Sequence, residues 1–346
     1  MMKNKVVTFG EIMMRLQPPG FLRFRQARSF DVIYGGGEAN VAVSLANYHM
    51  PSAFVTRLPD NDLGAACEMF IRQYGVDTSG IVRGGDRLGL YFIEAGAAQR
   101  GSKVIYDRAG SSLATIQPGM IDWETVFADA DWFHWTGITP AVSSGAAAAC
   151  LEAVQEAHRA SLTISSDFNY RKNLWKWGKQ PSEVMPELVK LCNVAICNEE
   201  DAEKVFGIKA PEVDVTAGKV EAAAYQVVAE RLVERFPNLG TIAFTLRGSI
   251  SASHNTWSGV LWQAGKFYAG RSYDINPIVD RVGGGDAFAG GLIYALHKSP
   301  DNPQYALEFA IGASCLKHGV VGDFNEATAD EVEKLIAGDA SGRVSR

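Results

Sequence analysis

The chain has 346 residues, of which 47% are hydrophobic and 21% charged, and its net charge is −6. This composition is typical of a soluble globular protein with ample apolar material for a core. The acidic balance and the lack of a long basic run argue against nucleic-acid binding. Because no apolar run reaches the roughly 18 residues that span a bilayer and no secretory cleavage pattern opens the chain, we expect a cytoplasmic protein without membrane contact.

The first half of the chain predicts strands alternating with helices. A strand begins at Lys5 and passes through Gly10 and Glu11, and residues 30–37 run into a glycine cluster before a helical pattern over 38–48. The next segments predict a strand, a helix and a strand that form one parallel unit, over 53–57, 62–74 and 76–81. Paired strands at 90–94 and 103–107, together with residues 15–34, predict a small sheet outside the main one.

The second half continues this alternation. Further strands are predicted over 132–137, 162–167, 194–196 and 241–245. Helices are predicted over 143–159, 181–192, 198–206, 219–236, 287–296 and 304–317. Antiparallel edge strands are expected over 251–257, 260–263 and 267–273. Thr328 and Glu331 form a capping box for a last helix that ends at Ala337. Such alternation is typical of an α/β protein with a largely parallel sheet.

Two polar segments follow predicted strands. Asp167, Asn169 and Arg171 come directly after the strand over 162–167, and ligands of open α/β sheets bind at the carboxyl ends of strands. Asn198 opens the following helix with an acidic turn, Glu199, Glu200 and Asp201. A polar loop and a plain acidic first turn are the alternative interpretations.

The most informative stretch is DRVGGGDAFAGG, which begins at Asp280. Gly283, Gly284 and Gly285 allow a sharp turn in front of a helix, whose unpaired N–H groups favour anionic oxygens. Asp286 then supplies a carboxylate that can act as a base, although a simple helix N-cap is the alternative. Gly290 and Gly291 predict close packing of this helix on a sheet. P-loop, dinucleotide-binding and protein-kinase motifs are absent.

This stretch resembles the C-terminal signature D-T-x-G-A-G-D of the ribokinase-like (pfkB) sugar kinases. Asp280, Gly283, Gly285 and Asp286 match it, while Arg281 replaces Thr and Gly284 replaces Ala. The segment YGGGEANVA is similar to the family's N-terminal signature G-G-x-x-x-N-x-A, in which Gly36, Asn40 and Ala42 match. A simple strand-to-helix turn is the alternative there.

The resemblance implies a ribokinase-like three-layer α/β/α body with a mainly parallel central sheet and a small β-sheet lid. Residues 1–340 would form this single domain, with lid strands from about 11–34 and 88–109, and residues 341–346 would be a C-terminal tail. In the family such a lid covers the sugar and often forms a dimer surface. We therefore expect a homodimer or a higher homo-oligomer formed through the lid.

The same resemblance assigns roles to site residues. Asp286 would be the catalytic base and Gly283, Gly284 and Gly285 the anion hole. Substrate would be bound by Gly36, Asn40, Tyr91, Tyr106, Arg108, Asn169 and Arg171. ATP would be bound by Asn198, Thr245, Arg247, Gly248, Gly283, Gly285 and His318, with the loop over 318–324 closing on the base. Mg²⁺ would accompany ATP through a water shell on Asn198 and Asp201, although the choice among the acids at 199–201 stays open.

The runs YDRAGSSLA, DFNYRKNLW and DRVGGGDAFAGG are similar to those of 2-keto-3-deoxygluconate kinases. Arg108 and Arg171 also supply two guanidinium groups, which suit a substrate carboxylate. The resemblance implies ATP-dependent phosphorylation of the terminal 6-hydroxyl of 2-keto-3-deoxy-D-gluconate, which gives 2-keto-3-deoxy-6-phosphogluconate for Entner-Doudoroff or uronate catabolism. The alternatives are a fructokinase or other ketose kinase, and a catalytically silent sugar-binding regulator.

Overall fold

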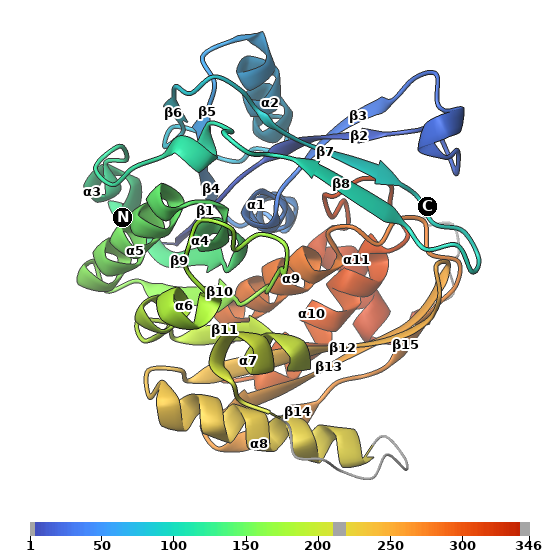
Figure 1. The fold of residues 1–346 in the computed structure, drawn as a ribbon. Coiled ribbons are helices and arrows are strands. Elements are labelled where there is room, and N and C mark those ends of the chain that lie inside the picture. Colours follow the sequence, from blue (N-terminus) through green and yellow to red (C-terminus); the bar gives the residue numbers. More distant parts are fainter. Residues whose placement is uncertain (1–3, 210–218, 340–346) are drawn as a thin grey trace.

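The computed structural model describes residues 4–209 and 219–339 (Figure 1). Within these residues the main sheet has nine strands. Eight of them lie in the order β14 (Lys266–Ala269), β13 (His254–Gln263), β12 (Thr241–Ser251), β11 (Val194–Cys197), β10 (Thr163–Asp167), β9 (Ala130–Thr136), β1 (Lys5–Phe9) and β4 (Ser52–Val55). The ninth, β15 (Tyr273–Ile275), pairs with β13. Pairing is parallel from β12 to β4 and antiparallel at β13, β14 and β15. The predicted mainly parallel central sheet is confirmed.

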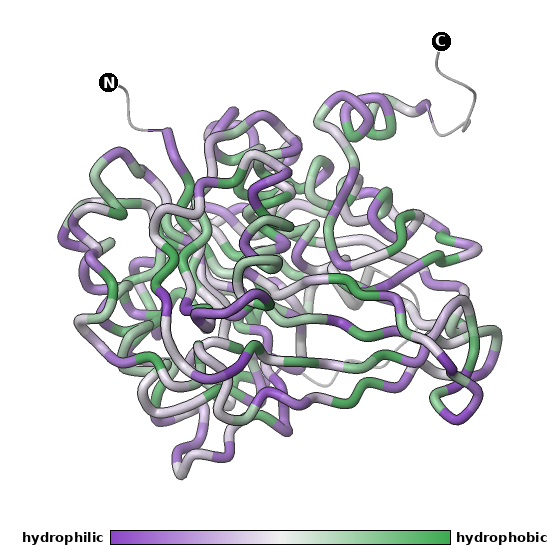
Figure 2. The backbone as a smooth tube through the Cα atoms, turned by 90° about the horizontal axis from the view of Figure 1, so that it is seen from above, coloured by the Kyte–Doolittle hydropathy of each residue, from purple (hydrophilic) through white to green (hydrophobic). Residues whose placement is uncertain are grey.

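Helices cover both faces of the main sheet. One layer contains α1 (Gly37–Asn47), α9 (Gly284–Lys298), α10 (Pro303–Lys317) and α11 (Ala329–Ile336). The other contains α3 (Trp123–Phe127), α5 (Ser144–Arg159), α6 (Pro181–Val189), α7 (Glu199–Phe206) and α8 (Lys219–Arg235), with α4 (Ile138–Val142) beside α5. Hydrophobic and hydrophilic segments alternate along the helices in Figure 2, as expected of helices that bury one side.

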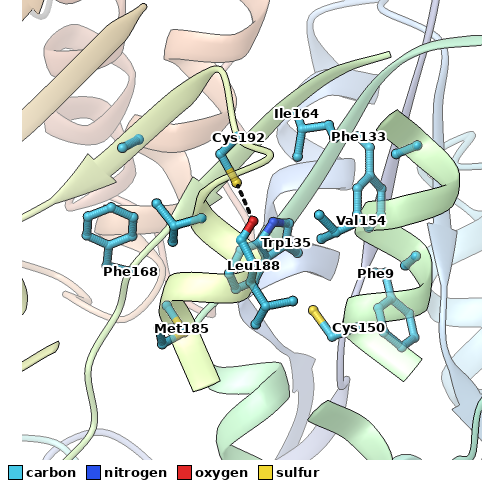
Figure 3. Close-up of a cluster of buried hydrophobic side chains, with 14 of the residues drawn as sticks. Phe9, Phe133, Trp135, Cys150, Val154, Ile164, Phe168, Met185, Leu188 and Cys192 are labelled. Atoms are coloured by element: carbon cyan, nitrogen blue, oxygen red, sulfur yellow. Dashed lines mark hydrogen bonds between the residues drawn. The ribbon is translucent and has the colours of Figure 1, made fainter. Parts of the chain in front are cut away.

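Each face of the sheet has its own hydrophobic core. Val7 and Phe9 of β1 pack toward α5 and α6, whereas Val6 packs toward α1 and α9, because neighbouring side chains of a strand point to opposite faces. Trp135 is fully buried in the first core, close to Leu188 and Cys192 (Figure 3), where the Cys192 thiol donates to the Leu188 carbonyl at 3.6 Å. Burial on both faces explains the continuous apolar runs of the parallel strands.

A second sheet lies beside the main body (Figure 1). Its strands are β3 (Asp31–Gly35), β2 (Met13–Gln17), β7 (Gly89–Glu94) and β8 (Lys103–Asp107), in that order. The confirmed fold class includes this separate smaller sheet, while its role as a lid and the extent of the domain stay predictions. A short pair, β5 (Arg57–Leu58) and β6 (Val82–Arg83), lies near α2 (Asp62–Arg72).

Two predicted strands differ in the structure. Residues 76–81 form no strand: Asp77 makes one bridge to Ala53, and its carboxylate then accepts from the Ser79 N–H at 2.9 Å, which turns the chain away. The strand predicted over 251–257 is also wrong in its bounds. β12 continues to Ser251 and β13 starts at His254, because the two strands pair as one long hairpin.

The glycine-rich helix also differs from expectation in detail. α9 begins at Gly284 rather than Ala287, and Gly283 is its N-cap, so Asp286 lies in the first turn and is not the cap. Gly290 and Gly291 pack on helices and not on the sheet. A Cβ on Gly290 would lie 2.7 Å from the Cβ of Ser44 in α1, and one on Gly291 would lie 3.0 Å from Cα of Ala310 in α10. The capping box of Thr328 and Glu331 is confirmed.

Among the described residues, no helix combines the length and apolarity that crossing a bilayer requires. The tail predicted at 341–346 lies outside the described residues.

The contact between α1 and α9 predicts a stability effect. Gly290→Val would force the two helices apart, and overpacking of this kind lowers the free energy of unfolding by about 1–3 kcal/mol. Urea denaturation measures the change. Gly101→Val is the matched control, since no atom lies within 4 Å of a Cβ at that position. Equal stability of the two variants would contradict the close packing.

Candidate active site

A cavity of about 480 Å³ opens where the parallel strands of the main sheet end. Residues at or just beyond the ends of β1, β10 and β11, and on β12 where its pairing with β11 stops, line it: Glu11, Asp167, Asn198 and Thr245. The second sheet contributes Met13, Tyr91 and Tyr106. This is the position at which open α/β sheets bind ligands.

The glycine turn presents backbone donors to this cavity. Gly283 has φ of 81°, and an ideal Cβ there would lie 1.9 Å from the Asp323 carbonyl oxygen, so both its backbone conformation and the close approach require glycine. Within the described part of the chain, the N–H groups of Gly283 and Gly285 form no hydrogen bond, and that of Gly284 makes a long one of 3.4 Å to the Arg281 carbonyl. All three glycines line the cavity. The turn is therefore able to receive an anion.

Asp286 lies beside these donors and is held by Asn40. The Asn40 side-chain nitrogen donates to the Asp286 carboxylate at 2.6 Å, and the Asn40 oxygen accepts from the Gly36 N–H at 3.2 Å. The residues thus join the N-terminal glycine turn to the C-terminal one. Burial raises the pKa of Asp286 to about 6, with a further contribution from Asp323, while the Asn40 hydrogen bond and Arg171 act in the opposite direction.

Two other carboxylates share this end of the cavity. Burial raises the pKa of Asp167 well above its usual range, and Asp201 and Asp286 add to the shift. Burial also raises the pKa of Asp201 to about 6, although its oxygens accept from the N–H groups of Asn198 at 3.0 Å and Tyr170 at 2.8 Å. Carboxylate oxygens suit a hard cation such as Mg²⁺, whose charge would offset the cost of burying these acids.

The described residues contain no cluster of three or more metal-ligating side chains that would hold an ion by themselves. Mg²⁺ commonly keeps several waters and binds through one or two carboxylates together with substrate phosphates. The acidic end of the cavity fits that mode of binding. Asn198 and Asp201 also form the capping box of α7, so Asp201 already serves a structural role.

The second sheet brings aromatic and basic groups to the cavity. The rings of Tyr91 and Tyr106 stack with centroids 6.0 Å apart, and the Arg108 guanidinium lies 5.9 Å from the centre of the Tyr106 ring. Arg108 forms an ion pair with Glu11. Another basic group of the cavity, Arg171, comes from the loop after β10 of the main sheet. Its side chain is exposed and donates to the Tyr170 carbonyl at 3.0 Å.

Most of the expected site residues line this one cavity. They are Gly36, Asn40, Tyr91, Tyr106, Arg108, Asn169, Arg171, Asn198, Asp201, Thr245, Arg247, Gly283, Gly284, Gly285 and Asp286. Gly248 and His318 are not part of its lining. His318 is buried against Gly284 and Trp257, with its Nδ1 2.7 Å from the Ser314 carbonyl oxygen. In the loop over 318–324, Asp323 reaches the cavity instead.

Sequence reasoning missed three acidic residues of the cavity wall, Glu11, Glu38 and Asp323. Glu38 is buried, and its Oε1 accepts from the Thr136 N–H at 3.0 Å and from the Thr136 and Thr139 hydroxyls at 2.8 Å. Burial raises the pKa of Glu38 to about 7. In the sequence an acid in the first turn of a helix is explained by the helix dipole alone, so Glu38 gave no separate signal.

The chain is similar to known proteins along nearly its whole length. The model of the family described as "pfkB family carbohydrate kinase" matches residues 3–327. The chain is 32% identical to a 2-dehydro-3-deoxygalactonokinase from Haloferax volcanii, with 99% of each chain covered.

Solved structures give the same result. A crystal structure of 2-dehydro-3-deoxygluconokinase from Thermotoga maritima is 44% identical, with a TM-score of 0.90 and coverage of 97% of this chain and 100% of that one. A putative ribokinase II from E. coli, at 18% identity and a TM-score of 0.78 over 96% of this chain and 99% of its own, shares the fold. The family match spans nearly the whole chain, and the chain therefore belongs to the pfkB family of carbohydrate kinases.

Proposed function

We propose that this kinase transfers the γ-phosphoryl group of ATP to the terminal 6-hydroxyl of 2-keto-3-deoxy-D-gluconate, which gives 2-keto-3-deoxy-6-phosphogluconate. The relatives from H. volcanii and T. maritima are named for 2-keto-3-deoxy sugar acids, which supports that substrate class. The observation that carries the proposal is the position of the Asp286 carboxylate beside the unpaired N–H groups of Gly283 and Gly285 in one cavity.

In the proposed reaction Asp286 takes the proton of the 6-hydroxyl, and that oxygen attacks the γ-phosphorus of ATP. The bond from the γ-phosphorus to its bridging oxygen breaks, and ADP leaves. The N–H groups of Gly283, Gly284 and Gly285 stabilise the transferred phosphoryl oxygens. Asn40 would position Asp286 through its 2.6 Å hydrogen bond rather than serve only as a sugar ligand.

The substrate carboxylate would meet Arg171 and Arg108. Arg108 already faces Glu11, which compensates part of its charge, whereas Arg171 has no carboxylate in ion-pair range within the described residues. Arg171 is therefore the better placed of the two to form a direct ion pair with a substrate acid. The remaining sugar contacts would come from Gly36, Tyr91, Tyr106 and Asn169, all of which line the cavity.

ATP would bind along Asn198, Thr245 and Arg247, with Mg²⁺ held through water by Asn198 and Asp201. The E. coli neighbour was solved with ATP and Mg²⁺, which supports this pairing of ligands. When bound, Mg²⁺ would neutralise charge on the phosphates. Glu200 is exposed on the cavity wall and is a second candidate for the water shell. Arg281, which replaces the family's Thr, also lines the cavity and would extend to the nucleotide phosphates.

The second sheet would also form the contact between subunits of a homo-oligomer. Its edge strand β8 is exposed along its whole length, including Val104 at 43% and Ile105 at 55%. Exposed apolar residues on an unpaired edge strand favour association with another chain.

Removal of the proposed base tests the mechanism. Asp286→Asn should lower kcat by about 10²-fold or more, on the usual scale for a lost general base, while ATP binding persists. The pKa of Asp286 is raised on folding, so its carboxylate destabilises the folded state as pH rises from about 4 through 6. The variant should therefore unfold at an equal or higher temperature at pH 8. Near-normal turnover would rule out the proposed role of Asp286.

The pH profile gives an independent test. Since the base must be ionised, kcat/KM for the sugar acid should fall tenfold per pH unit below an acid limb near pH 6, where Asp286 takes up its proton. Asn40→Ala removes a hydrogen bond that lowers the Asp286 pKa, so the limb should move to higher pH. An unchanged limb in Asn40→Ala would contradict the assignment.

A panel of sugars tests the substrate. In a coupled assay of ADP release, 2-keto-3-deoxygluconate should be phosphorylated faster than fructose, and its galactonate epimer shows whether the site separates the two acids.

Arg171→Gln should raise KM for the acid at least about tenfold, the scale of one lost charged contact, with little change for fructose. Lys172→Gln, the exposed neighbour outside the cavity, is the matched control. A preference for fructose would exclude the acid.

A further inference from the structure

A buried ion cluster lies under the cavity wall, and its central arginine, Arg15, has no part in the chemistry above. Arg15 of β2 is 1% exposed and does not line the cavity. Its Nη1 donates to Asp323 at 2.7 Å and its Nη2 donates to Asp280 at 2.6 Å. The second oxygen of Asp323 accepts from the Tyr91 hydroxyl of β7.

The cluster joins segments that are far apart in the chain. Arg15 and Tyr91 belong to the second sheet, Asp280 begins the glycine stretch, and Asp323 lies in the loop after α10. Arg15 is separated by 265 residues from Asp280 and by 308 from Asp323. One guanidinium therefore links the sugar side of the cavity to its phosphate side.

Both aspartates of the cluster also contact the glycine turn, Asp280 through its carboxylate and Asp323 through its backbone carbonyl. Asp280 accepts from the Val282 N–H at 3.0 Å and from the Gly322 N–H at 3.1 Å. The Asp323 carbonyl oxygen lies so close to Gly283 that a Cβ there would be 1.9 Å away. A shift of either aspartate would therefore move the backbone that carries the proposed anion-hole N–H groups.

The charges of the cluster depend on Arg15. Burial alone would lower the pKa of Arg15, but Asp323 and Asp280 raise it above its usual range. Lys317, a second buried cation beside the cluster, donates to the carbonyl oxygens of Asp280 at 3.2 Å and Val320 at 3.1 Å. Arg15 is thus the side chain that forms ion pairs with both carboxylates, and its planar fork reaches them simultaneously.

We propose that Arg15 is a positioning residue for phosphoryl transfer: it docks the second sheet onto the glycine turn, so that one ion cluster sets the sugar hydroxyl and the anion-hole donors relative to each other. This inference rests on the proposed kinase reaction. It requires that loss of the fork misaligns the two reactants without removing a contact to either. The effect should therefore appear in kcat far more than in KM, because a misplacement of about 1 Å can cost up to about 10²-fold in rate.

Arg15→Lys keeps the charge and loses the fork. Its kcat per folded molecule should fall about 10- to 100-fold, with KM for ATP and for the sugar acid within about threefold of wild type. Arg23→Lys is the matched control, since Arg23 also binds a carboxylate next to the second sheet, Glu94 at 3.2 Å, but has no link to the glycine turn. That control should keep wild-type kcat.

A double-mutant cycle separates positioning from general destabilisation. Asp280→Asn removes the charge paired with Arg15, and its effect on kcat should be non-additive with Arg15→Lys, because both changes act through one cluster. Urea unfolding of every variant gives the folded fraction. Additive effects on kcat, a wild-type kcat in Arg15→Lys, or an equal loss in Arg23→Lys would each overturn the proposal.

Should Arg15→Lys fail to fold, Asp280→Asn provides the same test from the other side of the ion pair. Asp280 lies outside the cavity lining, and a kcat-selective loss in this variant supports the proposal, whereas an unchanged kcat overturns it. Failure of the underlying kinase reaction would be seen separately, as a wild-type protein that phosphorylates no sugar of the panel.

Discussion

The hydrogen bond between Asn40 and Asp286 is the contact on which the site depends. It joins the first turns of α1 and α9, two helices that come from opposite ends of the chain and pack closely where Gly290 meets Ser44. Because the two helices cannot slide past each other at that contact, the carboxylate has a fixed position relative to both glycine turns. A buried carboxylate that costs desolvation energy needs such support, since a mobile carboxylate would turn toward water.

The arrangement of the two sheets depends on a different set of contacts, the ion pairs between them. The parallel sheet delivers several strand ends to one edge, but these ends form only part of a cavity. The remaining wall comes from a second sheet whose strands, as far as the structure describes the chain, pair with none of the main strands, so side-chain contacts help to place it. Ion pairs of Arg15 and Arg108 supply contacts across this boundary, and buried charge pairs favour one relative orientation over others.

Sequence reasoning reached the parts whose signals are local. Glycine clusters, strand ends and caps depend on neighbouring residues, so the central sheet, the cap of Asn198 and the glycine turn were predictable. The strand expected over 76–81 failed because one Asp77 side chain competes with the ladder for a backbone N–H. Arg15 was not predictable as part of the cluster, because its partners are 265 and 308 residues away and a lone arginine on a strand gives no hint of them.

The charges of the cavity separate into two groups once internal pairs are removed. Arg108 forms an ion pair with Glu11, and Asp323 forms one with Arg15. Among the described residues, Arg171, Arg247 and Arg281 then remain as cations on the wall without an ion-pair partner, and the carboxylates that remain with raised pKa values are Glu38, Asp167, Asp201 and Asp286. A protein of net charge −6 attracts anions poorly at long range, so these arginines must do so locally. The carboxylates instead repel an anion that arrives without a cation. A polyphosphate with a bound metal ion satisfies both groups, because its phosphates suit the arginines and its metal ion suits the carboxylates.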